Sequence, residues 1–86
     1  MLTEQFKVIG ATKIAVPGPG NEDINFDKMD LEIIRYLAKG YINREIAENI
    51  SFSEGTVKNR ISRLLSLTGL KDRSQIVVFA LKNGIV

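Results

Sequence analysis

Three side chains able to donate hydrogen bonds lie close together in the stretch SEGTVKNRISRLL, residues 53–65: Lys58, Asn59 and Ser62. On a helix they share one side, because residues three and four apart are neighbours there. Lys can donate to O6 and N7 of guanine, Asn can bond N6 and N7 of adenine, and Ser can bond several base edges. The chemistry that these residues could carry is the reading of base edges in a DNA groove. The alternative is a polar face that contacts only solvent.

Four further residues near this group could bind phosphate. Arg60 and Arg63 flank it on the same predicted helix. Thr56 lies in the first turn, where hydroxyl and backbone N–H groups bind anions. Arg44 begins the preceding helix, and its equal alternative is a surface pair with Glu48 four residues on. Because such contacts position a protein on the DNA backbone rather than read sequence, we expect all four residues to contact phosphate.

The basic residues are concentrated around this segment. Residues 1–53 carry six Lys or Arg against eight Asp or Glu, residues 54–73 carry five against two, and the chain has a net charge of +2. A local basic surplus is what binding to a polyanion needs. The chain has no Cys and no His, which leaves an enzyme only carboxylates or Lys to work with. We therefore expect no catalytic residue, no metal and no cofactor.

The polar group needs a helix to present it, and the sequence predicts one over residues 53–67. Ser53 is its N-cap, and apolar residues follow at helical spacing and are predicted to face the core: Val57, Ile61, Leu64 and Leu65. A shorter helix is predicted just before it, over residues 43–50. A short helix, a tight turn and a longer helix form a helix-turn-helix, here over about residues 42–61, whose second helix enters the major groove.

A first helix is predicted over residues 28–39. Asp27 is a good N-cap for it, and Asp30 occupies the capping-box position three residues on. Its apolar stripe comprises Ile33, Ile34 and Leu37. With the fourth helix described next, these elements predict an all-α fold of four helices.

The last helix follows Asp72 as its N-cap, with Gln75 completing a second capping box. Four of its apolar residues are predicted to face the core: Ile76, Val77, Ala80 and Leu81. Val78 and Phe79 would then be exposed beside Gln75, and two large apolar neighbours on a surface suggest a contact site. The alternative is that Phe79 covers the N-terminal segment.

Residues 1–25 differ from the rest of the chain in composition. Two β-prone pieces around residues 10–12 could form a weak hairpin, and the Pro- and Gly-rich stretch 17–23 is a linker signal. We expect an N-terminal extension or linker over residues 1–25 and one domain over residues 26–86. No apolar run is long enough to span a membrane and no signal peptide is present, which predicts no membrane association and a cytoplasmic location.

Several motifs of the domain occur in one family: NREIA at residues 43–47, SEGTVKNR at 53–60, LKDRSQ at 70–75 and the closing ALKNGIV. With these motifs residues 26–86 closely resemble the LuxR/NarL-type helix-turn-helix domain, found at the C-terminus of many bacterial response regulators and quorum-sensing regulators. The chain departs from the family in having Ile42 where a Ser usually precedes the second helix. It also has Arg60 where His is common, which adds a permanent charge.

The resemblance implies sequence-specific binding to double-stranded promoter DNA, as the output domain of a bacterial transcription regulator in a two-component system, and not an enzyme. It implies that Lys58, Asn59 and Ser62 face base edges. It further implies a homodimer through the last helix, to which we assign Gln75, Val78 and Phe79, with RNA polymerase as a further candidate partner.

Two alternatives stay open for the function. A receiver domain does not fit within residues 1–25, so the chain is either the output half of a response regulator or a stand-alone small regulator. A helix-turn-helix used for protein contact is the other class. Its reading helix would be expected to carry apolar or aromatic anchors in place of Lys58, Asn59 and Ser62.

Overall fold

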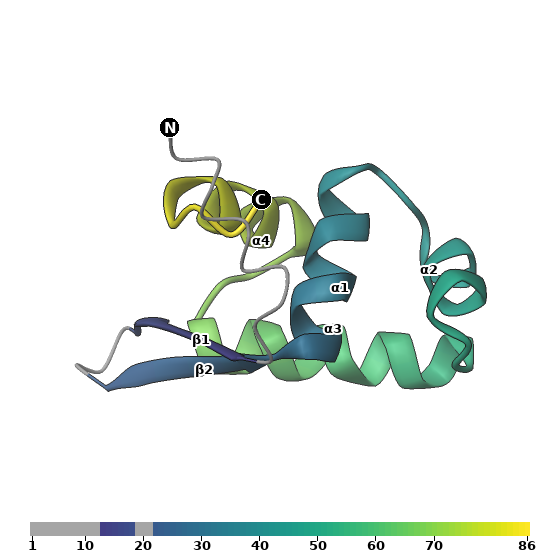
Figure 1. Cartoon of the computed structure of the whole chain (residues 1–86), viewed down its shortest axis with the longest axis horizontal. Coiled ribbons are helices and arrows are strands. Elements are labelled where there is room, and N and C mark those ends of the chain that lie inside the picture. Colours follow the sequence, from purple (N-terminus) through teal and green to yellow (C-terminus); the bar gives the residue numbers. More distant parts are fainter. Residues whose placement is uncertain (1–12, 19–21) are drawn as a thin grey trace.

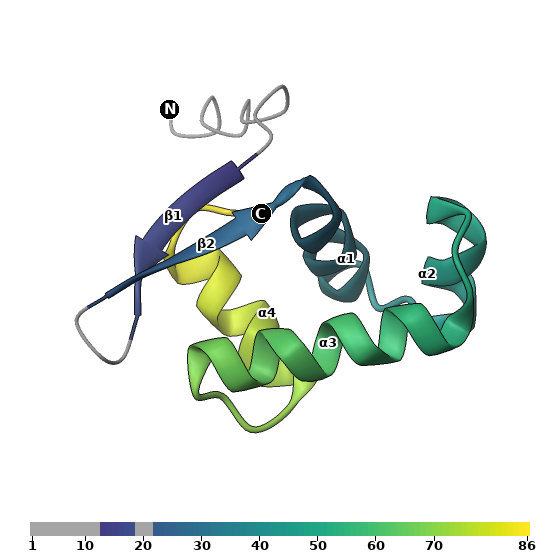
Figure 2. The same cartoon turned by 90° about the horizontal axis from the view of Figure 1, so that it is seen from below.

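The computed structural model describes residues 13–18 and 22–86. Within them a short β-hairpin precedes four helices (Figure 1), in the order β1 (Lys13–Pro17), β2 (Asp23–Asp27), α1 (Lys28–Ala38), α2 (Asn43–Ile50), α3 (Glu54–Thr68) and α4 (Arg73–Lys82). The predicted helical architecture is confirmed, and each helix begins and ends within about one residue of its predicted bounds. Figure 2 shows α3 crossing the domain, with α2 near its N-terminal end and the hairpin and α4 near its C-terminal half.

Three of the four helices begin with the predicted side-chain caps. In α1 the Asp27 carboxylate accepts from the Asp30 N–H, and Asp30 accepts in return from the Asp27 N–H, which confirms the capping box. Ser53 accepts from the third residue of α3. Asp72 likewise accepts from the N–H of Gln75, whose own side chain accepts from Lys71 rather than from the cap residue. Each cap satisfies a backbone N–H that has no partner within the helix.

The turn between α2 and α3 sets the angle between the two helices. Ser51 has a φ of 61°, the left-handed conformation that ends many helices, and the Phe52 N–H donates to the Ala47 carbonyl at 3.0 Å. At the other end of α2, Ile42 has no side-chain acceptor, and Glu45 accepts from the Ile42 N–H at 2.9 Å. Glu45 therefore satisfies the backbone where the family's usual Ser is missing.

The hairpin is antiparallel, and it places residue 16 of β1 opposite residue 24 of β2. Its buried side chains alternate with exposed ones, as expected for a strand pair with one face on a core: Val16, Ile24 and Phe26. Of the stretch 17–23, predicted as a linker, Pro17 belongs to β1 and Asp23 to β2. Gly18 is required there, because a Cβ would lie 2.7 Å from the Glu22 carbonyl oxygen. The predicted turn at residues 10–12 lies outside the described residues.

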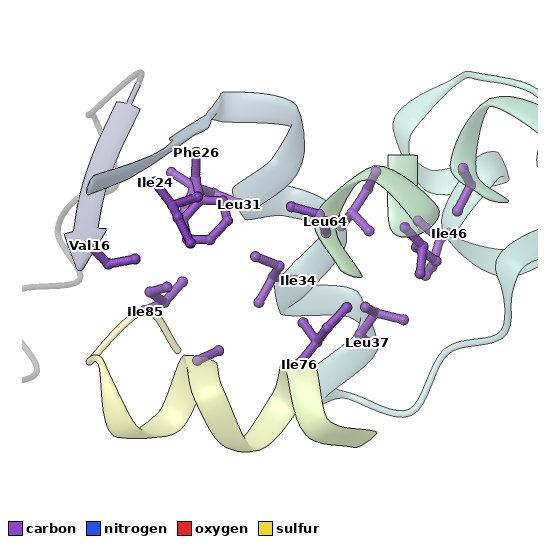
Figure 3. Packing of buried hydrophobic residues seen from close by; sticks show 14 of the residues in the cluster. Val16, Ile24, Phe26, Leu31, Ile34, Leu37, Ile46, Leu64, Ile76 and Ile85 are labelled. Atoms are coloured by element: carbon purple, nitrogen blue, oxygen red, sulfur yellow. The ribbon is translucent and has the colours of Figure 1, made fainter. Parts of the chain in front are cut away.

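One hydrophobic core joins the hairpin to all four helices (Figure 3). Side chains from the strands, α1, α3, α4 and the C-terminal segment after α4 point into the same interior, among them Phe26, Ile34, Leu64, Ile76 and Ile85. Buried apolar side chains of this kind supply most of the stability of a small domain. Val16 and Ile24, which lie upstream of the predicted domain boundary, thus belong to this core. In the described part of the chain, no helix is both long and apolar enough to cross a bilayer.

Candidate nucleic-acid interface

The outer arc, as we call Lys58, Asn59 and Ser62, lies on the solvent side of α3. All three residues are exposed, whereas Val57, Ile61 and Leu64 on the opposite side are buried, as their spacing predicts. The three side chains make no hydrogen bond or ion pair with any other described residue. The outer arc therefore presents one amine, one amide and one hydroxyl to whatever approaches α3.

Arg60 and Arg63 are held by two carboxylates of the protein itself. Arg60 Nη1 lies 3.1 Å from Asp27 Oδ2 and 3.0 Å from Asp30 Oδ1. Arg63 Nη1 lies 3.1 Å from each carboxylate oxygen of Asp30. We call these four residues the arginine–aspartate cluster. Sequence reasoning assigned the two aspartates only to helix capping and the two arginines to phosphate, so it missed the cluster.

The cluster shifts the pKa values of two of its members. Burial alone would raise the pKa of Asp27, but the Asp30 N–H and the Arg60 guanidinium donate to its carboxylate and together lower that pKa below its ordinary value. The pKa of Arg60 is raised, chiefly by its hydrogen bond to Asp27, against the opposing effect of burial. Asp30 is fully buried, and its carboxylate accepts from Arg60, Arg63 and the Asp27 N–H.

The first turn of α3 differs from the prediction made for Thr56. Its N–H donates to Ser53 Oγ at 3.1 Å, and its hydroxyl lies 3.0 Å from the same oxygen. The expectation that the Thr56 N–H is free for phosphate is therefore wrong, because the N-cap occupies it. The hydroxyl keeps further hydrogen-bonding capacity, since a hydroxyl has one donor and two acceptor positions.

At the start of α2, Arg44 is exposed. The ion pairs of residues 13–18 and 22–86 do not include an Arg44–Glu48 pair, which was the alternative to a phosphate role. The neighbouring Asn43 does not cap α2; its Oδ1 accepts from the guanidinium of Arg73. That bond, which sequence reasoning also missed, joins the beginnings of α2 and α4.

The exposed face of α4 differs from the predicted one by two residues. Phe79 is half-buried, and its ring packs edge-on against Phe26, with ring centroids 6.3 Å apart. The expectation that Phe79 is exposed is wrong, because its ring packs against Phe26 at the end of the hairpin. Phe26 is the first residue of the predicted domain, so this contact does not test the alternative that Phe79 covers the segment 1–25. Leu81, predicted to face the core, is 60% exposed, and Val78 is 50% exposed. The exposed residues of α4 include Gln75, Val78 and Leu81, which are three residues apart along one side of the helix.

Comparison with known sequences identifies the family. A family profile described as bacterial regulatory proteins, luxR family, matches residues 28–80, more than half of the chain. The chain belongs to the LuxR family. It is a helix-turn-helix domain of a transcription regulator, and its matched residues run from the first residue of α1 into α4.

Several bacterial members of the LuxR family are similar to this chain. The transcriptional regulatory protein YxjL of Bacillus subtilis is 46% identical over 61 residues, which cover 71% of this chain and 28% of YxjL. DegU of Brevibacillus brevis is 41% identical over 59 residues, 69% of this chain and 25% of DegU. The response regulator protein VraR of Staphylococcus aureus is 37% identical over 57 residues, 66% of this chain and 27% of VraR. The chain thus aligns with less than a third of each relative.

Proposed function

We propose that α3 enters the major groove of a promoter and that the outer arc reads base edges there, so that the domain directs transcription from a specific sequence. One observation carries this proposal: Lys58, Asn59 and Ser62 are exposed and free of partners within the described protein, on the side of α3 opposite its buried stripe. Their groups match those that bond guanine and adenine in the major groove. We propose recognition of DNA alone for this domain, without catalytic activity.

Phosphate contacts would fix the position of α3 in the groove. Arg44 at the exposed start of α2 and the Thr56 hydroxyl at the start of α3 are suited to this role. The positive end of the α3 dipole adds to the attraction of phosphate. The affinity of such contacts falls as salt concentration rises, because bound cations are released from the DNA.

We further propose that the exposed side of α4 pairs two copies on DNA, through Gln75, Val78 and Leu81 in place of the predicted Phe79. The exposed aliphatic side chains of Val78 and Leu81 are three residues apart and form a small apolar patch beside the amide of Gln75. The similarity to VraR, a response regulator by name, supports a role as the output domain of a two-component regulator in the bacterial cytoplasm. RNA polymerase is a further proposed partner at the promoter.

The test begins with selection of bound sequences from random double-stranded DNA. Asn59→Ala is then expected to weaken binding to the selected duplex by about 1–3 kcal/mol, or about 5- to 150-fold, because a bidentate base contact is lost. Lys58→Ala is expected to act in the same direction. Binding to an unrelated duplex, measured by fluorescence anisotropy, should change little for Asn59→Ala.

Lys39→Ala is the charge-matched control for Lys58→Ala, since Lys39 is exposed at the end of α1. If Lys58→Ala and Asn59→Ala both bind the selected duplex as tightly as the parent, the base-reading assignment fails. If the selection enriches no sequence at all, a helix-turn-helix used for protein contact becomes the better hypothesis. A selected palindrome would support pairing through α4, and loss of paired-site binding in Leu81→Asp would locate it there.

A further inference from the structure

The arginine–aspartate cluster has a role that capping and phosphate binding do not cover. We infer that Asp27 and Asp30 are positioning residues for DNA reading: through Arg60 and Arg63 they fix how α3 is rotated about its axis, and so where the outer arc points. The two arginines serve this purpose instead of the phosphate contacts predicted from sequence. The inference rests on the proposed function, because it concerns the same reading helix.

The geometry shows how firmly α3 is held. Asp30 is fully buried at the third position of α1, and both of its oxygens accept from Arg63 Nη1 at 3.1 Å. Arg60, one turn earlier on α3, donates to Asp30 at 3.0 Å and to Asp27 at 3.1 and 3.3 Å. Two points on α3 are thus tied to one end of α1. A DNA phosphate would have to displace a carboxylate to take either Nη1 atom.

The two arginines are next to residues of the outer arc in the sequence of α3, so their ion pairs affect where the outer arc points. Arg60 directly follows Asn59, and Arg63 directly follows Ser62. Successive residues of an α-helix are about 100° apart around the axis, so each arginine is fixed beside a residue of the outer arc. A rotation of α3 that moved Asn59 out of register with a base would therefore break the ion pairs of the cluster.

The ion pairs of the cluster also reduce the positive charge that α3 can offer to DNA phosphates. The cluster contains two arginines and two aspartates, so most of the basic surplus counted over residues 54–73 is neutralised inside the protein. Within the described residues, Lys58 is the cation of α3 that has no carboxylate partner. The cations of α3 available to phosphate are therefore fewer than the sequence suggests.

The test measures affinity for the selected duplex and for an unrelated duplex over a range of salt concentrations, for the parent, Arg63→Gln and Asp30→Asn. A lost phosphate contact lowers the slope of log K against log salt by about 0.9. We expect Arg63→Gln to leave the slope on the unrelated duplex nearly unchanged and to lower the ratio of the two affinities about 10-fold. Arg44→Gln, at a proposed phosphate contact, is the comparison for the slope.

Asp30→Asn distinguishes most clearly between phosphate binding by Arg63 and positioning of α3 by the cluster. If Arg63 bound phosphate, removing a competing carboxylate would tighten binding to both duplexes and leave their ratio unchanged. If Asp30 is a positioning residue, Asp30→Asn should lower the ratio of the affinity for the selected duplex to that for the unrelated duplex. The double variant Asp30→Asn/Arg63→Gln should then lower this ratio no further than the worse single variant does. A smaller folded fraction scales both affinities alike, so loss of stability does not move the ratio.

A slope reduced by about 0.9 in Arg63→Gln, or a ratio unchanged in Asp30→Asn, would overturn the inference while leaving the proposed function in place. A parent that prefers no duplex would overturn the proposed function, and the inference with it. The two failures are therefore distinguishable in one set of measurements.

Discussion

The outer arc and the two arginines of the arginine–aspartate cluster alternate along α3, and yet they have opposite surroundings. Lys58, Asn59 and Ser62 are exposed and make no bond with another described residue, whereas Arg60 and Arg63 donate to carboxylates of the β2–α1 junction. A basic residue on a predicted recognition helix is therefore not by itself a phosphate contact. Its role depends on what the preceding elements place beside it.

Replacing both arginines of the cluster should have the largest effect. The double variant Arg60→Ala/Arg63→Ala leaves the buried Asp30 carboxylate with only the Asp27 N–H, and an unpaired buried charge costs about 3–5 kcal/mol. Urea unfolding followed by circular dichroism measures this loss. If the double variant does not fold, Arg63→Ala alone should show a smaller loss of the same sign. A double variant as stable as the parent would show that the cluster contributes nothing to the fold.

Replacing Asp30 should lower the free energy of unfolding less than replacing both Arg60 and Arg63. Asp30→Asn keeps the shape of the side chain but removes hydrogen bonds to charged groups, for an expected loss of about 1–3 kcal/mol. The freed guanidiniums are tolerated better than a freed carboxylate, because the side chains of Arg60 and Arg63 are 28% and 46% exposed and can reach water. Equal losses in the two unfolding experiments would contradict this asymmetry.

The charge of Asp27 should give the cluster a measurable dependence on pH. Because its pKa is lower in the folded protein than in the unfolded chain, the stability it contributes is present above the ordinary Asp value and is lost as pH falls through the folded value. Asp27→Asn keeps an N-cap acceptor but does not titrate. Its unfolding free energy should therefore fall less than that of the parent between about pH 5 and pH 2. Ser62→Ala, which removes no titratable group, should follow the parent.

Substitutions in the outer arc should have the smallest effect on stability. Lys58→Ala and Ser62→Ala remove exposed side chains that have no described partner, so each should change the unfolding free energy by less than about 0.5 kcal/mol. The same thermal or urea unfolding series measures both. A loss above about 1 kcal/mol for either would show that the outer arc contributes to the fold, and the contrast between the two regions of α3 would disappear.

Features set by neighbouring residues in the sequence were predicted well. The caps formed by Asp27, Ser53 and Asp72 each depend on a residue three positions away, and all three are present in the structure. The buried stripes of α1 and α3 follow from helical spacing in the same way. These features depend only on residues a few positions apart, which is why a local sequence pattern predicts them.

Features set by distant residues were predicted poorly, for identifiable reasons. Residues 76–81 are six consecutive apolar residues, so spacing alone could not choose the buried side of α4, and Phe79 and Leu81 were interchanged. The ion pairs of Arg60 join positions 30 and 33 residues apart, which no local pattern reports. The base-reading roles of the outer arc stay predictions, because they concern contacts with DNA.

The β2–α1 junction bears on how this domain could be moved between proteins. The family profile begins at residue 28, but Asp27 caps α1 and binds Arg60, and the Phe26 ring lies against Phe79. A chimeric regulator joined at residue 28 would leave the ring of Phe79 without its partner and α3 without its ion pair to Asp27. A chimera joined just before Lys13 would carry both. For this member of the family, the unit that can be exchanged between regulators is therefore longer than the unit that sequence similarity marks.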